Sequence, residues 1–309
     1  MKIFYRCIAA LPLGLLYILS NCLYIVIFYV ARYRRAVVKD NISQAFSDKS
    51  ENEINQLVKS FYRFLCDNFI EVLKSLSMRD KELDGRVTFR NPEIFDRYIE
   101  QQQSMLLLTI HQSNWEWLLL ALSVKLSFPI DVIYKPLSNR PLDELMRHSR
   151  ESHGAKVIAH NTAAKEILKK RREFRGFVMA ADQSPSANKK KYWQYFMNRA
   201  AAFHIGPQKI AEMLNYPVIY MKMHRLGRGY YEVSFEELSV PPYDQPPFDK
   251  DRYEILSRYI KTGEEAIKGQ PFTYLWSNRK WRRNPETSVN NVNTPVQGPQ
   301  DSPSPAPDV

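Results

Sequence analysis

The sequence predicts an α/β protein: a mostly parallel mixed sheet flanked by helices, with an N-terminal hydrophobic anchor helix. Two observations support this fold class. A long uncharged segment opens the chain, and from about residue 92 helix-like runs alternate with short runs rich in β-branched and aromatic residues. Such alternation is typical of parallel sheets, because the connection between two parallel strands is usually a helix.

The opening segment, residues 7–31, contains 25 residues and no charge. A helix rising 1.5 Å per residue would cover about 30 Å of hydrocarbon with that length, so we expect a membrane anchor over residues 1–32. A cleaved signal peptide is the alternative, but no small-residue cleavage site follows the apolar run. More basic residues follow the segment than precede it, which by the positive-inside rule favours a body that faces the cytoplasm.

The next predicted element is a long amphipathic helix over residues 52–79, whose apolar side chains recur every three or four positions. Further helices are expected at 93–102, 116–126, 140–152, 162–172, 205–215 and 250–268. Strands are expected at 105–110, 131–134, 156–158, 177–181, 218–223 and 230–235, with a hairpin turn at Gly227-Arg228-Gly229 between the last two.

Residues 284–309 hold six prolines and few large apolar side chains, so we expect a disordered tail after a main domain over residues 33–283. The tail has three acidic and no basic residues. The rest of the chain therefore carries 44 basic against 30 acidic side chains, a charge of +14. This charge suits an anionic membrane surface, an acidic carrier or nucleic acid. The three cysteines form no CxxC pair, so neither a disulfide framework nor a zinc site is expected.

The chemistry is expected where the strand at 105–110 runs into His111-Gln-Ser-Asn-Trp-Glu116. Loops beyond the carboxyl ends of strands are the usual ligand sites of open α/β sheets. On one helix, residues five apart would point about 140° away from each other. We therefore expect His111 in the loop, Asn114 near the helix cap, and Glu116 in the first turn, where it accepts a hydrogen bond from the imidazole.

The plainer alternative is that His111 only ends a strand and Glu116 only begins a helix. The sequence lacks the motifs of several other enzyme classes. It has no GxSxG elbow of serine hydrolases and no P-loop of kinases, and His148, His153 and His160 match no zinc-ligand spacing.

Several blocks in the same order resemble the bacterial lipid A biosynthesis (lauroyl/myristoyl) acyltransferases, a branch of the lysophospholipid acyltransferase superfamily. The resemblance covers roughly residues 1–283 and begins with the anchor and the His111/Glu116 motif. The remaining blocks are residues 35–46, Tyr134-Lys135-Pro136-Leu-Ser-Asn139, Ala181-Asp182-Gln183, Phe203-His-Ile-Gly206-Pro207 and 276–282.

This resemblance implies an O-acyltransferase that moves a fatty acyl chain from acyl carrier protein to a lipid A precursor or related glycolipid. It implies His111 as general base and Glu116 as its orienting partner. Substrate-binding roles fall to Asn114, Lys135, Asn139, Arg147, Asp182 and Gln183. Lys135 or Arg147 would steady an oxyanion or a phosphate. No metal or other cofactor is implied beyond the carrier thioester, and the partners are acyl carrier protein, the lipid acceptor and the membrane, with no nucleic acid.

Two departures leave the acceptor open. Ala200–Phe203 stand where the family usually has threonines, and Asn278 stands where histidine is common. A lysophospholipid or an amino-acid lipid is the alternative acceptor. From a different class, the basic body and the cationic, aromatic run at 189–197 also suit a non-catalytic membrane-surface or nucleic-acid-binding protein, whose nucleic-acid binding would weaken steeply with salt.

Overall fold

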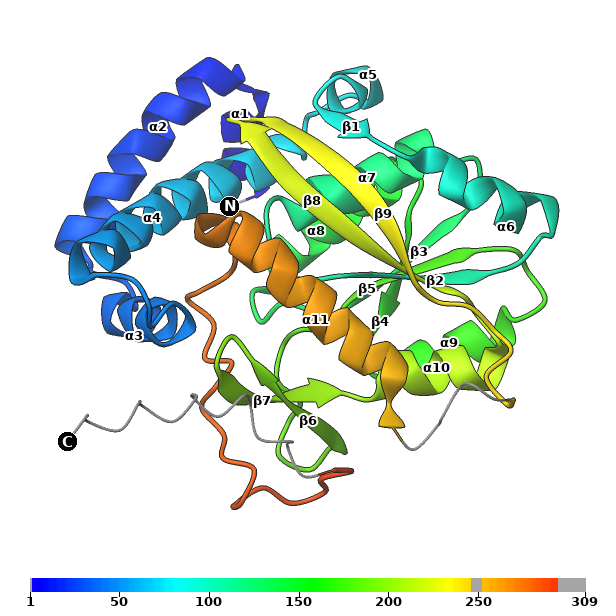
Figure 1. Cartoon of the computed structure of the whole chain (residues 1–309). Helices are drawn as coiled ribbons and strands as arrows, with labels where there is room; N and C mark the ends of the chain where they lie inside the picture. The colour runs from blue at the N-terminus through cyan, green and yellow to red at the C-terminus, as the bar shows by residue number, and fades with distance from the viewer. Residues whose placement is uncertain (1, 246–251, 294–309) are drawn as a thin grey trace, which may run out of the picture.

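The computed structural model describes residues 2–245 and 252–293 (Figure 1). Its helices are α1 (Lys2–Ala10), α2 (Leu13–Ile25), the π-helical η1 (Val26–Val30), α3 (Arg35–Ala45), α4 (Glu51–Lys74), α5 (Asp80–Asp84), the 3-10 helix η2 (Pro92–Phe95), α6 (Asp96–Glu100), α7 (Trp115–Lys125), α8 (Arg140–Ser152), α9 (Ala163–Lys169), α10 (Gly206–Leu214), α11 (Glu254–Gly269) and the 3-10 helix η4 (Pro271–Thr273). Its strands are β1 (Val87–Phe89), β2 (Met105–Thr109), β3 (Ile130–Tyr134), β4 (Lys156–Ala159), β5 (Gly176–Ala180), β6 (Lys191–Phe196), β7 (Arg199–His204), β8 (Val218–Gly227) and β9 (Tyr230–Ser239).

The main sheet has seven strands in the order β1-β9-β8-β2-β5-β3-β4. All neighbouring pairs are parallel except β8 and β9, which form an antiparallel hairpin. The predicted mostly parallel α/β sheet is therefore confirmed. Helix α11 crosses one face of this sheet and α7 lies on the other (Figure 1).

Strand β2 shows how the sequence separates the two faces. Leu106 and Leu108 join one buried cluster with α11, whereas Met105 and Leu107 join a second cluster with α7. Side chains alternate along a strand, so a central strand covered on both faces becomes a continuous apolar run. This is why the run at 105–110 lacks any polar alternation.

Most predicted elements occur within a few residues of their expected bounds, and the hairpin turn at 227–229 is confirmed. Helix α4 begins at a capping box, where Ser50 and Glu53 satisfy each other's backbone amides. It ends at Lys74, earlier than expected, and α5 follows as a separate short helix. Positions 250 and 251 of the helix predicted at 250–268 lie outside the described residues.

The hairpin of β6 and β7 was not predicted, and it changes the interpretation of the run at 189–197. Within this run Lys191, Tyr192, Trp193 and Phe196 are buried. The Lys191 ammonium donates to the carbonyl oxygens of Ala187, Lys189 and Val289. These residues thus build the core, and they do not form the expected surface patch.

Residues 284–293, which composition assigned to a disordered tail, instead run beside β6. The amide of Lys191 donates to the Asn290 carbonyl at 3.0 Å, and the amide of Val292 donates to the Lys191 carbonyl at 2.9 Å. This segment has few apolar side chains, and its asparagines contact β6 through hydrogen bonds: Trp193 Nε1 donates to Asn291 Oδ1 at 2.8 Å. Residues 294–309 lie outside the described residues.

The predicted anchor is divided into α1, a break at Leu11-Pro12, α2 and η1. Within the described residues, Leu13–Val30 is the one helical stretch long and apolar enough to cross a membrane. It packs along α4, and the two helices lie side by side in Figure 1.

Candidate active site

His111 lies just beyond β2, in a tight turn that leads into α7. Ser113 in this turn has a φ of 54°, a left-handed conformation that costs about 1 kcal/mol for a residue other than glycine. Two buried hydrogen bonds hold it there: the Ser113 amide donates to the Thr273 carbonyl at 3.0 Å, and its hydroxyl donates to the Met223 carbonyl at 2.8 Å. The backbone around His111 is therefore fixed by distant segments.

The imidazole of His111 is paired with Asp182. Strands β2 and β5 are parallel neighbours, with Thr109 opposite Ala180, so the residues two positions beyond each strand meet. His111 Nδ1 lies 2.6 Å from Asp182 Oδ1, which also accepts from the His111 backbone amide at 3.1 Å. The hydroxyl of Tyr274 donates to the other carboxylate oxygen at 3.2 Å. Asp182 thus fixes both the position and the orientation of the ring.

Charge distribution favours the ion pair. Burial disfavours an ionised Asp182, but His111 and nearby Lys280 outweigh it and hold the carboxyl pKa below its usual range. Burial likewise opposes a charged imidazole, yet the carboxylates of Asp182 and Glu116 raise the pKa of His111. In the neutral imidazole, with Nδ1–H donated to Asp182, Nε2 is an acceptor, and the Gln183 amide nitrogen lies 3.2 Å from it.

Glu116 is in the first turn of α7, as expected, but it pairs with a different residue. Its carboxylate accepts from Arg150 of α8, with Nη2 to Oε1 at 2.7 Å and Nε to Oε2 at 3.0 Å. Among the described residues, the carboxylate that pairs with the imidazole is that of Asp182, and not that of Glu116 as expected. Glu116 acts on His111 through its charge alone.

Two of the predicted substrate-binding residues cap helices. The Asn114 side chain accepts from the Trp117 amide at 3.0 Å and donates to Glu71 at 3.0 Å, and it is fully buried. No part of it is exposed to a substrate. Asn139 caps α8 by accepting from the Leu142 amide at 3.2 Å. Asn114 is thus a buried helix cap, whereas Asn139 caps α8 from an exposed position, and its substrate-binding role stays a prediction.

Arg147 is also on α8, but its exposed guanidinium pairs with Glu151 one turn along the helix at 3.3 Å. The buried arginine of this helix is Arg150. Its Nη1 is buried and has no hydrogen-bond partner among the described residues, and its guanidinium lies over the Tyr134 ring. Arg150 therefore has a buried guanidinium nitrogen without a hydrogen-bond partner among the described residues, whereas Arg147 is exposed.

Lys280 is a buried cation that sequence reasoning missed. Its ammonium donates to the Ala202 carbonyl at 2.5 Å and lies 3.5 Å from the centre of the Phe203 ring. Burial lowers its pKa to about 7, and the charge of Asp182 partly opposes this shift.

A group of basic side chains surrounds the same edge of the sheet. Burial, followed by the positive charges of Lys280, His160, Lys135 and Lys189, lowers the pKa of His204 to about 4. Lys135 and His160 directly follow β3 and β4, so the carboxyl ends of the parallel strands bring them to the side that carries His111. The role of Lys135 beside an oxyanion or phosphate stays a prediction.

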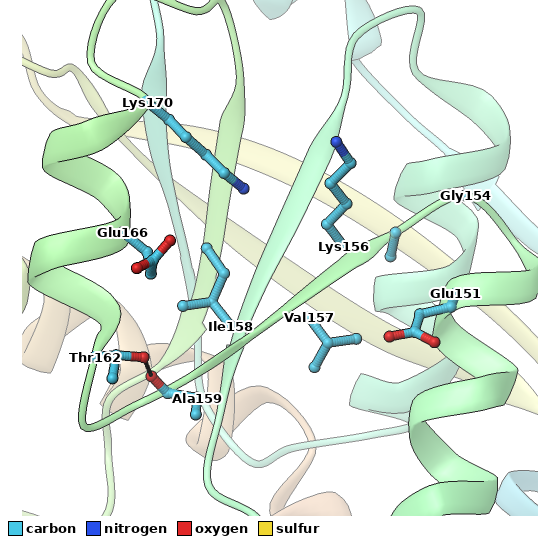
Figure 2. Close-up of a pocket in the computed structure, with 10 residues that line it drawn as sticks. Glu151, Gly154, Lys156, Val157, Ile158, Ala159, Thr162, Glu166 and Lys170 are labelled. Atoms are coloured by element: carbon cyan, nitrogen blue, oxygen red, sulfur yellow. Dashed lines mark hydrogen bonds between the residues drawn. The ribbon is translucent and has the colours of Figure 1, made fainter.

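A groove lies elsewhere on the molecule. It has a volume of about 640 Å³ and follows the edge strand β4, between α8 and α9, bordered by charged side chains that include Glu151, Lys156 and Lys170 (Figure 2). None of the predicted site residues borders it. Because the groove lies beside a sheet edge and away from His111, it takes no part in proton transfer at the imidazole.

Comparison with known proteins identifies the family of this chain. No curated protein matches the chain. The sequence does match the family model of the bacterial lipid A biosynthesis acyltransferases over residues 1–283, nearly the whole of the described structure. The chain belongs to the bacterial lipid A biosynthesis acyltransferase family.

Proposed function

We propose that this protein transfers a fatty acyl chain from acyl carrier protein to a hydroxyl of a lipid A precursor or related glycolipid at the bacterial inner membrane. Family membership supports an acyltransferase role. The observation that carries the mechanism is the His111–Asp182 pair, because it leaves Nε2 as a proton acceptor at the carboxyl edge of the sheet.

In the proposed reaction, the acceptor hydroxyl replaces Gln183 as the partner of His111 Nε2 and gives it a proton. The hydroxyl oxygen attacks the carbonyl carbon of the thioester, so a C–O bond forms and the C–S bond then breaks. The imidazolium returns the proton to the leaving thiolate. Asp182 stabilises the imidazolium and keeps the proton on Nδ1, which is the orienting role of the acid in a catalytic triad.

Glu116 has a positioning role in this proposal. It holds Arg150 through two hydrogen bonds, and the unpaired Nη1 of Arg150 can donate to a phosphate or to the developing oxyanion. Lys135 adds positive charge on the same side. Acyl carrier protein is acidic, so the excess of basic side chains in this chain favours its approach from the cytoplasm.

The direct test is acyl transfer from acyl carrier protein by purified His111→Ala protein. We expect a loss of roughly 10²-fold or more, the usual effect of removing a general base. His148→Ala is the matched control, because that imidazole is exposed on α8. Full transfer by folded His111→Ala protein would contradict the mechanism.

Lipid mass spectrometry of a deletion strain tests the acceptor. We expect a lipid A precursor one acyl chain short to accumulate. Accumulation of a lysophospholipid or an unacylated amino-acid lipid would instead identify the alternative acceptor, which the alanines at 200–202 leave open.

A further inference from the structure

The outward face of α2 and η1 is a continuous apolar stripe. Leu15, Ile18 and Val30 are 53%, 60% and 75% exposed. With them the stripe contains Leu11, Leu19, Cys22, Ile25, Val26 and Tyr29, all exposed. These positions recur every three or four residues, so they share one side of the helix. A stripe of this length is unusual on a protein surface exposed to water.

The opposite face of the same helix is packed against the body. Leu13, Leu16, Ser20 and Tyr24 are buried there. Tyr17 donates to Glu71 at 2.8 Å, and Ser20, further along α2, donates to Asp67, which comes earlier in α4, at 2.6 Å. Helices α2 and α4 are thus antiparallel neighbours, in contact along most of α2.

This packing decides how a membrane can meet the helix. Asp67 forms ion pairs with Arg225 at 2.8 Å and Arg228 at 2.9 Å, and these arginines belong to the β8–β9 hairpin. If α2 crossed the bilayer while packed in this way, the charged part of α4 and the tip of the hairpin would enter the hydrocarbon with it. Charged side chains at the centre of a bilayer are costly. A helix lying flat keeps these charges on the protein side.

Charge on this side of the molecule suits an anionic lipid surface. The first 39 residues contain six basic and no acidic residues. Arg32, Arg34 and Arg35 directly follow the stripe and are exposed, and Arg6 precedes it. Cations at the edge of an apolar face are the pattern of helices that lie at the membrane interface.

We propose that residues 11–30 lie in the plane of one leaflet, with the apolar stripe inserted among the acyl chains and α4 above it, and that they do not cross the bilayer. The lipid partner is an anionic bilayer surface. The inference goes beyond acyl transfer: it rests on the packing of α2 and is measured without any acyl donor or acceptor, so the two proposals can fail separately.

Depth measurement in vesicles of phosphatidylethanolamine and phosphatidylglycerol tests the proposal. The native Cys22 is exposed on the stripe and Cys66 is buried, so a Cys7→Ser background gives one accessible label site. Leu15→Cys and Tyr29→Cys, each with Cys22→Ser, give two more. An environment-sensitive label quenched by spin-labelled lipids should report the same shallow depth at all three positions, in the leaflet that the protein binds.

A spanning helix gives a different result, with the deepest label at position 22 and the labels at 15 and 29 in opposite leaflets. That result would overturn the proposal, as would a label shielded from lipid in a dimer.

Vesicle sedimentation gives an independent measurement. Ile18→Glu should weaken binding to anionic vesicles about tenfold or more, because a charge replaces an inserted apolar side chain. Met213→Glu is the matched control: Met213 is 56% exposed on α10 and should bind vesicles like the unaltered chain. Equal binding by both variants would contradict insertion of the stripe.

Discussion

His111 is held by contacts from two distant segments of the chain. Asp182 follows β5, and Tyr274, which follows η4, donates to Asp182. The His111 carbonyl accepts from the Leu275 amide at 3.0 Å. Because Asp182 accepts from both the ring and the backbone amide of His111, the imidazole has little freedom to rotate away from Asp182. A general base held in this way is ready before the substrate arrives, which lowers the cost of orienting it.

Asp182→Asn tests the electrostatic part of this arrangement. His111 acts as a base only when neutral, so activity is present above its folded pKa and is lost as the pH falls through it. The Asp182 carboxylate raises this pKa against the opposing effect of burial. Without the carboxylate, the acid limb of the kcat/KM profile should move to lower pH, and kcat should fall by roughly 10²-fold or more.

Asp84→Asn is the control, because this exposed carboxylate pairs only with Lys125 among the described residues. Its pH profile should match that of the unaltered enzyme. An unchanged acid limb in Asp182→Asn would show that Asp182 does not set the protonation of the base.

Two arginines of α8 pair with glutamates, Arg150 with Glu116 of α7 and Arg147 with Glu151 of α8, and they offer a matched comparison of stability. Glu116→Ala leaves the buried Arg150 without its charge partner and should lower the free energy of unfolding by about 3–5 kcal/mol. Glu151→Ala removes the exposed partner of Arg147 and should cost less than about 1 kcal/mol. Denaturant unfolding in detergent measures both. Similar small losses would mean that Arg150 finds water or another partner.

At the scale of elements, the β8–β9 hairpin connects the body to α2. Gly229 has a φ of 71°, and its amide donates to Glu71 at 2.9 Å. A Cβ at this position would lie 2.6 Å from the Tyr17 hydroxyl. Gly229→Ala should therefore destabilise the fold by about 1–3 kcal/mol through backbone strain and a clash with α2.

Gly227→Ala is the matched control in the same hairpin, because a Cβ there meets nothing within 4 Å. It should change the free energy of unfolding by less than about 0.5 kcal/mol. Thermal unfolding of both proteins decides the matter, and equal melting temperatures would contradict a close contact between the hairpin tip and α2.

Local pattern was enough to predict most elements of the main sheet. Helix α8 has the predicted bounds, 140–152, because Asn139 caps it, proline lies in its first turn and its apolar residues recur with helical spacing. The hairpin of β6 and β7 was missed for a physical reason. Its run of basic and aromatic residues has the composition of an exposed surface. In the structure three carbonyl groups accept hydrogen bonds from the Lys191 ammonium, which allows this strand to be buried.

The candidate site was predicted in position but not in pairing. The strand-to-helix junction at His111 can be recognised from one segment of sequence. The partner of the imidazole depends on which strand lies next to β2. That neighbour is β5, and Asp182, which follows β5, is 71 residues from His111 in the sequence. Spacing along the chain favoured Glu116, whereas the order of strands in the sheet selects Asp182. Arg150 and Lys280 were missed because their burial is a tertiary property.

At the scale of the whole molecule, the N-terminal helices belong to the folded body. Lys74 of α4 donates to the carbonyl groups of Ala9 and Leu11, both at 3.1 Å, at the break between α1 and α2. Further along, Tyr62 of α4 donates to the Tyr33 carbonyl just beyond η1. The apolar segment thus has polar attachments to the body near both ends, unlike a tether that only holds a soluble domain near a membrane.

Loss of this segment should therefore cost stability as well as membrane binding. A chain without residues 1–30 loses hydrogen-bond partners of Asp67, Glu71 and Lys74 and exposes the apolar face of α4, so we expect a lower melting temperature and aggregation in detergent. The double variant Tyr17→Phe, Ser20→Ala keeps the apolar stripe but removes one part-buried and one buried hydrogen bond to carboxylates. It should lose about 2–5 kcal/mol while still binding vesicles. A helix that contributes to the core cannot be removed without leaving buried charged groups unpaired. A truncated chain as stable as the full one would therefore show that the segment is a detachable anchor.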